Sequence, residues 1–242
     1  MEERVISIRK VRNPKISIII PTLNEEKYIP FTLISLRNQN FRKKYEIIVS
    51  DSNSKDRTIE IAKKYADKII VTKRMGVSVG RNLGAKHSKG KILLFVDADT
   101  ILLPDVLERV YRVMKEKDVV GCNVPLLLDD LKRNFYFSFH IPIYYLLTQI
   151  KLNPTYSVVF ACKREAFFKV GGFNEKLRVA EDIELGQRLK KIGRIAYLTD
   201  TFAISSARRY KKWGAWRTFY HWLGSYFYIK LLNKQLPYPP IR

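Results

Sequence analysis

Asp97 and Asp99 are the residues whose type and spacing best suit metal chemistry. They follow an apolar run, Ile92 to Val96, that predicts a buried strand, and ligands of open α/β sheets bind at the carboxyl ends of such strands. Side chains two residues apart in an extended segment project to the same side, so both carboxylates can face one Mg²⁺ or Mn²⁺ ion. Through that ion they would hold a diphosphate. The alternative is structural, because such residues also cap helices and Pro104 is expected to open one.

Two more polar segments follow predicted strands. The segment Pro21-Thr22-Leu23-Asn24-Glu25 offers hydroxyl, amide and carboxylate groups that suit a ribose or the edge of a base. The carboxylate of Asp51, after the next strand, can accept N–H groups of uracil or guanine. Both segments have a structural alternative, since Asn24 is suited to cap a helix and Asp51 to lie in an ordinary turn.

A cation and two acids complete the candidate chemistry. Arg81 lies in a glycine-containing segment near a helix start, where it can reach a phosphate or simply occupy the helix surface. Glu181 and Asp182 open a later helix, and acids in a first turn stabilise the helix dipole whatever their function. A carboxylate at the mouth of a cleft also suits a general base acting on an acceptor hydroxyl.

The elements that position these residues alternate between strand and helix, which predicts an α/β fold with a mixed, mostly parallel sheet flanked by helices. We expect strands at 16–20, 45–50, 68–71, 92–96, 119–125 and 156–161. Helices are expected at 26–37, 56–65, 78–86, 104–117, 164–168 and 181–191. The aromatic stretch at 135–147 gives no clear pattern.

The end of the chain differs in composition, because no Asp or Glu follows Asp200 while basic and aromatic residues accumulate. Apolar residues from Trp213 to Leu231 recur at three- and four-residue steps, which predicts an amphipathic helix. Such a helix either lies on a membrane or packs on the catalytic domain, and amphipathicity alone fits both. We therefore expect a domain over 1–204 and a basic, aromatic helical extension over 205–242.

The chain of 242 residues has 45 Lys and Arg against 23 Asp and Glu, a formal net charge of +22. That excess attracts nucleic acid, anionic lipid or phosphate-bearing substrates, and does not choose among them. Cys122 and Cys162 are too few for a disulfide scaffold and are expected in the core. The first 15 residues lack the apolar region of a secretory signal, so we expect a cytoplasmic protein at the cytoplasmic face of the membrane.

Taken in order, these segments resemble the family-2 glycosyltransferases of the GT-A fold, which use nucleotide-sugar donors. The resemblance covers about residues 17–196. It rests on SIIIPTLNEEKYI, EIIVSDSNSKDRT, GRNLGAKHSKGKILLFVDADT and VGGFNEKLRVAEDIELGQRLKKIG. Asp51-Ser52-Asn53-Ser54 departs from the usual acidic pair followed by Gly-Ser, which leaves the donor base open. Gln187-Arg188-Leu189 lacks the Gln-x-x-Arg-Trp signature of polymerising members, which favours transfer of a single sugar.

The resemblance implies roles for individual residues. Asp182 matches the catalytic base, and Asp97 and Asp99 match the D-x-D motif that holds Mg²⁺ or Mn²⁺. In that motif Asp99 is expected as the direct ligand, and Asp97 either shares the metal or contacts the ribose. The remaining positions are expected to bind the nucleotide-sugar: Pro21, Thr22, Leu23, Asn24, Glu25, Asp51, Arg81, Asp97, Ala98, Gly171, Gly172 and Glu181.

These roles imply an inverting enzyme that moves one sugar from a UDP- or GDP-type donor to an acceptor. The basic aromatic tail favours a lipid-linked acceptor, such as a polyprenyl phosphate, and peripheral membrane contact. One alternative is a nucleotidyltransferase of related fold, but 21–26 has no Gly-rich basic loop. Another is a non-catalytic protein that binds membrane or nucleic acid, although strand-end carboxylates repel phosphates. We expect no nucleic-acid partner.

Overall fold

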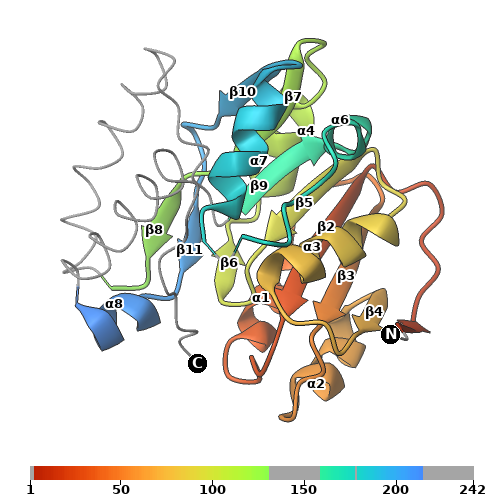
Figure 1. Cartoon of the computed structure of the whole chain (residues 1–242), viewed down its shortest axis with the longest axis vertical. Coiled ribbons are helices and arrows are strands. Elements are labelled where there is room, and N and C mark those ends of the chain that lie inside the picture. Colours follow the sequence, from red (N-terminus) through yellow and green to blue (C-terminus); the bar gives the residue numbers. More distant parts are fainter. Residues whose placement is uncertain (1–2, 131–158, 178, 215–242) are drawn as a thin grey trace.

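The computed structural model describes residues 3–130, 159–177 and 179–214 (Figure 1). A large sheet contains β1 (Arg4–Ser7), β2 (Ile16–Thr22), β3 (Tyr45–Asp51), β4 (Lys68–Val71), β5 (Ile92–Val96), β7 (Val119–Asn123), β9 (Val159–Lys163) and β10 (Arg194–Tyr197). A small sheet contains β6 (Thr100–Leu102), β8 (Leu126–Leu128) and β11 (Ala203–Ser205). The helices are α1 (Ile29–Arg37), α2 (Thr58–Tyr65), α3 (Val77–Lys86), α4 (Val106–Val113), α6 (Arg164–Lys169), α7 (Glu181–Lys190) and α8 (Arg208–Trp213).

The large sheet has the strand order β1-β4-β3-β2-β5-β9-β7-β10, and the small sheet has the order β6-β11-β8. Strands β4, β3, β2 and β5 are parallel neighbours, and β7 is parallel to β10. Strand β1 pairs antiparallel with β4, and β9 pairs antiparallel with both β5 and β7. The predicted mixed, mostly parallel sheet is therefore confirmed.

Helices cover both faces of the large sheet, and the alternation of side chains along β2 shows how. Ile18 and Ile20 point to the face packed against α1, α2 and α4, whereas Ile19 points to the face packed against α3, α6 and α7. All three are fully buried. A strand buried on both faces needs a continuous apolar run, which is why β2 and β5 were visible in the sequence.

Two glycines let α3 lie close to the sheet. A Cβ atom on Gly84 would lie 2.4 Å from Cγ2 of Ile19, and one on Gly80 would lie 3.0 Å from Cβ of Pro21. Contacts under about 3 Å are not tolerated between carbon atoms, so larger side chains would push α3 away from β2. The helix that carries Arg81 is thus set against the end of β2.

Several predicted boundaries were wrong. Helix α1 begins at Ile29 and not at 26, because the Glu25 carbonyl accepts the N–H groups of Tyr28 and Ile29 in a turn before the helix. Helix α4 spans Val106–Val113 and not 104–117, because the chain after it tightens into i→i+3 turns.

Other differences concern strands. The expected strand 119–125 ends at Asn123 as β7, and β9 runs on to Lys163. Short strands β1, β6, β8, β10 and β11 were not predicted at all. The aromatic stretch 135–147, residues 156–158 of the expected strand and the amphipathic pattern beyond residue 214 lie outside the described residues.

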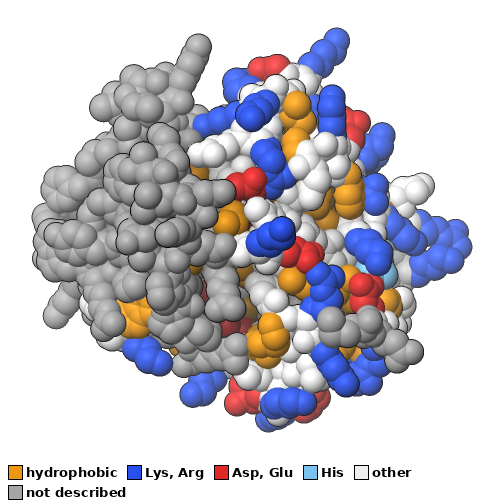
Figure 2. Space-filling view, in the orientation of Figure 1, with side chains coloured by type: hydrophobic (Ala, Val, Ile, Leu, Met, Phe, Trp, Pro, Cys, Tyr) orange, Lys and Arg blue, Asp and Glu red, His pale blue; other side chains and the backbone are white. Residues whose placement is uncertain are grey.

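The two cysteines are free and buried in the core, as predicted. Within the part of the chain that the structure describes, no helix combines the length and apolarity needed to cross a membrane. Figure 2 shows Lys and Arg side chains spread over the described part of one face, with Asp and Glu among them. The positive charge on this face is therefore dispersed.

Candidate functional site

The loops after β2, β3 and β5 meet at one edge of the large sheet, because these strands are parallel neighbours. Pro21 and Thr22 end β2, and Asp51 ends β3. The loop after β5 carries the predicted acidic pair and Ala98, and the loop after β2 carries Leu23, Asn24 and Glu25. The structure thus places these predicted site residues at one edge, the place where open α/β sheets bind ligands.

Arg81 connects two other predicted residues. Its Nη2 donates to Oδ1 of Asp97 at 2.8 Å, and its Nη1 donates to Oε1 of Glu181 at 2.8 Å. The guanidinium also lies over the ring of Phe173, 5.1 Å from the centroid. Arg81 is therefore not an ordinary surface residue of its helix, and a contact with phosphate stays a prediction.

The charges around Arg81 are strongly coupled. Its side chain is 6% exposed. Burial alone would lower its pKa, but Asp97, Glu181 and Asp182 outweigh burial and raise the pKa above its ordinary value. Asp182, in the first turn of α7, therefore shares the electrostatic surroundings of Arg81. Breaking a buried ion pair typically costs about 3–5 kcal/mol, because the remaining charge loses its compensation.

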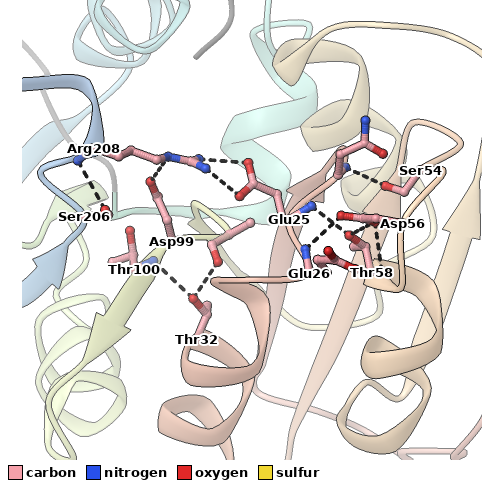
Figure 3. A network of polar contacts seen from close by, with 12 residues as sticks. Glu25, Glu26, Thr32, Ser54, Asp56, Thr58, Asp99, Thr100, Ser206 and Arg208 are labelled. Carbon is pink, nitrogen blue, oxygen red and sulfur yellow. Dashed lines mark hydrogen bonds and ion pairs between the residues drawn. The ribbon is translucent and has the colours of Figure 1, made fainter. Parts of the chain in front are cut away.

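A second arginine lies between two more of the predicted acids. Nη1 and Nη2 of Arg208 each donate to a carboxylate oxygen of Glu25 at 2.8 Å, and Nε lies 2.9 Å from Oδ2 of Asp99. Figure 3 shows the guanidinium between these carboxylates, reaching in from α8. The guanidinium also lies 4.7 Å from the centroid of the Tyr28 ring. We call Glu25, Asp99 and Arg208 the Arg208 cluster.

The ionised form of Asp99 is disfavoured in this cluster. Burial raises the pKa of its carboxyl to about 6; Arg208 opposes that rise, whereas Asp97 and Glu25 reinforce it. The rise persists despite the nearby guanidinium because Arg208 is shared with Glu25. A buried carboxylate with negative neighbours gains most from an additional cation.

Asp51 is fully buried and accepts three hydrogen bonds from its neighbours. Oδ2 accepts from Oγ1 of Thr22 at 2.7 Å and from Oγ of Ser54 at 2.6 Å, and Oδ1 accepts from N of Ser54 at 2.7 Å. This carboxylate joins the ends of β2 and β3. Its predicted contact with the donor base stays a prediction, because the structure shows it bound within the protein.

Asn24 does not cap α1, whose N-cap residue is Tyr28. Its N donates to Oγ of Ser54 at 2.8 Å, and its Oδ1 accepts from N of Lys55 at 2.8 Å. Its φ of 55° lies in the left-handed region, which Asn tolerates better than most residues. Asn24 therefore ties the loop after β2 to the loop after β3.

The same two loops are joined at further points, drawn in Figure 3. N of Glu25 donates to Oγ1 of Thr58 at 2.7 Å, and N of Glu26 donates to Oδ2 of Asp56 at 3.1 Å. These bonds use backbone donors that precede α1, so the protein itself holds the loop. Glu25 is thereby held where its carboxylate meets Arg208.

The capping alternative for the acidic pair was also wrong. Helix α4 has Asp105 as its N-cap residue, so neither Asp97 nor Asp99 caps it. Oδ1 of Asp105 accepts from Oγ1 of Thr201 at 2.8 Å. The two predicted ligands are left at the sheet edge, paired with Arg81 and Arg208.

Gly171 and Gly172 lie in a turn after α6, with φ values of +84° and +70° that favour glycine. Asn82 on α3 anchors this turn, because its Nδ2 donates to O of Phe173 at 2.9 Å and its Oδ1 accepts from N of Phe173 at 2.8 Å. The turn therefore lies beside Arg81, the neighbour of Asn82. The predicted contact of the glycines with the donor sugar stays a prediction.

The residues present fit a divalent cation by charge and by donor type. Among residues 3–130, 159–177 and 179–214, no three His, Cys, Asp or Glu side chains form a ready metal-binding group. Mg²⁺, however, is usually held by one or two carboxylates together with substrate phosphates. Two guanidiniums here face five carboxylates, which leaves a local excess of negative charge in a basic chain: Glu25, Asp97, Asp99, Glu181 and Asp182.

Arg208 is the site residue that sequence reasoning missed. It was counted in the basic tail after Asp200, where its spacing resembles that of surface cations. The signal that would have found it is the short strand β11 just before it, which brings the chain back beside β6 and the acidic pair. A three-residue strand of mixed burial leaves little trace in a sequence.

Comparison with known proteins agrees with this geometry. The family described as "Glycosyl transferase family 2" matches residues 17–175. An uncharacterised glycosyltransferase of Haemophilus influenzae is 29% identical over 177 residues, which are 70% of this chain and 60% of that protein. The chain therefore spans less than two thirds of the length of this relative. The matched family region contains all three strand-end loops and ends before Glu181 and Arg208.

Solved structures share the fold. The mannosyltransferase PcManGT of Pyrobaculum calidifontis, in complex with GDP-Man and Mn²⁺, superposes with a TM-score of 0.74 at 21% identity, over 96% of this chain and 68% of that one. TarS 1–349 of Staphylococcus aureus, in complex with UDP-GlcNAc, superposes with a TM-score of 0.64 at 23% identity, over 79% of this chain and 58% of that one. The architecture is thus that of GT-A glycosyltransferases.

Proposed function

The chain belongs to glycosyl transferase family 2, and from that premise we propose that it transfers one sugar from a nucleoside diphosphate sugar to an acceptor. The observation that carries the proposal is the meeting of five carboxylates and two guanidiniums at the carboxyl edge of the sheet. A UDP- or GDP-type donor is supported by the two structural neighbours, one with GDP-Man and one with UDP-GlcNAc.

Within this proposal, Asp97 and Asp99 hold Mg²⁺ or Mn²⁺ together with the donor diphosphate. When bound, the cation supplies charge stabilisation for the departing nucleoside diphosphate. Asp182 accepts the proton of the acceptor hydroxyl as its oxygen attacks the anomeric carbon, so the sugar configuration inverts. Arg81 fixes Asp97 and Glu181 relative to Asp182, which limits the motion of the groups around the reacting atoms.

A donor panel tests the proposal. UDP-, GDP- and dTDP-sugars are incubated with the purified protein and Mn²⁺ or Mg²⁺, and nucleotide release is measured. We expect release from one donor class, abolished by chelation and by Asp99→Asn. Asp118→Asn, which neutralises an exposed acid paired with Arg194, is the matched control and should leave release unchanged. Release that is insensitive to Asp99→Asn would refute the metal role.

The same panel separates the alternatives. A nucleotidyltransferase would consume a nucleoside triphosphate and a sugar phosphate. Release of pyrophosphate when these two compounds are added to the protein would support that function. Salt-sensitive RNA binding without turnover of any donor would support a non-catalytic role. Family membership favours the glycosyltransferase over both.

For the acceptor, we propose a lipid-linked or otherwise membrane-associated molecule. The net charge of +22 and the absence of acidic residues after Asp200 in the sequence support attraction to an anionic surface. Each basic residue near such a surface is worth about 1 kcal/mol. Lys211 and Lys212, at the end of α8, are exposed and available for that contact.

Vesicle binding tests the membrane contact. A variant with Lys211, Lys212, Arg217, Lys230 and Lys234 changed to Gln is compared with one in which Lys10, Lys44, Lys63, Lys64 and Lys73 are changed to Gln. Both lose the same charge, and the substitutions leave Arg208 intact. We expect only the variant changed at Lys211, Lys212, Arg217, Lys230 and Lys234 to lose binding to vesicles of phosphatidylglycerol and phosphatidylcholine. Equal binding by both variants would contradict a specific role of the tail.

A further inference from the structure

All three guanidinium nitrogens of Arg208 lie against carboxylates, and the two carboxylates come from different loops. Nη1 and Nη2 form a bidentate pair with Glu25, and Nε faces Asp99 at 2.9 Å. The three side chains are only 21%, 11% and 12% exposed, respectively for Arg208, Glu25 and Asp99. The cation therefore lies against the carboxylate that the proposed function assigns to the metal.

Arg208 is not needed to fasten its own helix. The backbone N of Ala207 donates to Oδ1 of Asp129 at 2.8 Å, and Tyr210 packs in a buried cluster with Leu128 and Ala207. These contacts attach α8 to β8 without the guanidinium. The side chain of Arg208 can consequently change partners while the start of α8 stays in place.

One guanidinium does not balance its surroundings. It carries a single positive charge against Glu25 and Asp99, and Asp97 adds a further negative charge next to Asp99. A divalent cation at Asp99 would neutralise more charge than Arg208 does, but it would compete with Nε for the Asp99 carboxylate. The displaced guanidinium would then face the phosphates of a donor, for which its planar fork is well suited.

We propose that Arg208 exchanges partners during donor binding: it neutralises Glu25 and Asp99 in the free protein, and it moves to the diphosphate when a divalent cation takes Asp99. This inference rests on the proposed function, because it assigns a second role at the same site. It makes the binding of metal and nucleoside diphosphate depend on each other. Arg208 thus competes with the metal for Asp99 in the free protein and binds the diphosphate leaving group once the donor is present.

The test measures binding and not turnover. Mn²⁺ is titrated into the full chain and the free ion is followed by electron paramagnetic resonance, with no nucleotide, with UDP or with GDP. We expect the wild type to bind Mn²⁺ alone weakly and to bind it at least about tenfold more tightly with one of the nucleotides, within the usual range of coupling between sites.

Arg208→Gln removes the competing cation. We expect this variant to bind Mn²⁺ alone about tenfold more tightly than the wild type, and to gain less than about threefold from the nucleotide. Lys211→Gln is the matched control, because it removes an exposed positive charge from the same helix and should behave as the wild type. Arg208→Lys keeps the charge but loses the fork, so its Mn²⁺ affinity should be intermediate.

The outcomes separate the inference from the function on which it rests. If Mn²⁺ binds with a nucleotide, but Arg208→Gln binds Mn²⁺ alone no better than Lys211→Gln does, the exchange is refuted and the proposed function stands. If no protein binds Mn²⁺ under any condition, both are refuted. A thermal melt checks that Arg208→Gln is folded, and Arg208→Lys supplies the comparison if it is not.

Discussion

Asp182, the proposed proton acceptor, lies in the first turn of α7 and within the field of Arg81. We predict that Asp182→Asn lowers turnover on an alcohol acceptor by about 10²–10⁴-fold, the usual contribution of a general base. Binding of the nucleoside diphosphate should change little, because the carboxylates assigned to the metal remain. Turnover is followed by nucleotide release, and binding by calorimetry.

Glu165→Gln is the control for the helix-dipole explanation. Glu165 is an exposed acid in the first turn of α6, so it shares the dipole contribution of Asp182 but not its place at the site. Equal losses in both variants would contradict a catalytic role. Little loss in Asp182→Asn on a phosphate acceptor would indicate an acceptor already ionised near neutral pH.

Asp99 predicts a distinctive pH dependence of stability. Its folded-state pKa of about 6 lies above the ordinary value of 3.8, so between these values the folded protein binds more protons than the unfolded chain. Its contribution to the free energy of unfolding therefore falls as pH rises through that window, by about 1–3 kcal/mol. Asp99→Asn lacks this titration.

Chemical denaturation in the presence of a chelator measures the effect. We expect the stability of Asp99→Asn relative to the wild type to rise between pH 4 and pH 7. A difference that stays constant over this range would show that burial of Asp99 does not raise its pKa. Asp118→Asn, whose acid is exposed and has its pKa lowered by Arg194, should show no such rise.

At the level of elements, α3 sets the site by lying close to β2. We predict that Gly84→Ala destabilises the protein by about 1–3 kcal/mol, because the new methyl group would lie 2.4 Å from Ile19 in a closely packed core. Gly80→Ala, with its nearest contact at 3.0 Å, should cost less. Denaturant unfolding gives the free energy of unfolding of both variants. A Gly84→Ala variant as stable as the wild type would contradict the packing explanation.

The elements that the sequence revealed are those with a continuous apolar run or a clear helical period. Strands β4 and β5 were predicted with their observed bounds, because buried parallel strands concentrate Ile, Leu and Val. The small sheet of β6, β8 and β11 was missed, since strands of three residues are too short to show a period.

Because the small sheet was missed, only part of the candidate site was predicted. The acidic pair and the acids of α7 were identified from their position beside strong elements. Arg208 was not, because only the pairing of β11 with β6 brings it to Asp99. The hydrogen bonds of Asp51 with Thr22 and Ser54 were likewise not predicted, since the contact with Thr22 depends on the register of two neighbouring strands.

For the whole molecule, the contrast of an acidic site in a basic chain predicts stabilisation by ligands. Mn²⁺ together with the correct nucleoside diphosphate should stabilise the folded state by about 2.7 kcal/mol at one hundred times the dissociation constant. For a chain of this size, that corresponds to a rise in Tm of roughly 5–10 °C. Differential scanning fluorimetry measures it. Mn²⁺ alone should produce a much smaller rise.

The matched variant and the chelator define the control. Asp99→Asn should lose most of this rise, and excess chelator should reverse it in the wild type. A rise of equal size in Asp99→Asn would place the metal elsewhere. An equal rise with nucleotide in the presence of chelator would indicate donor binding that does not depend on a metal.

The most direct measurement is the anomalous X-ray signal of Mn²⁺ in crystals grown with the nucleoside diphosphate selected by the donor panel. We predict one strong peak at coordination distance from Asp99 and beside the diphosphate, with Arg208 no longer paired with Asp99. A nucleotide bound away from the edge formed by β2, β3 and β5, or a peak remote from Asp99, would contradict it.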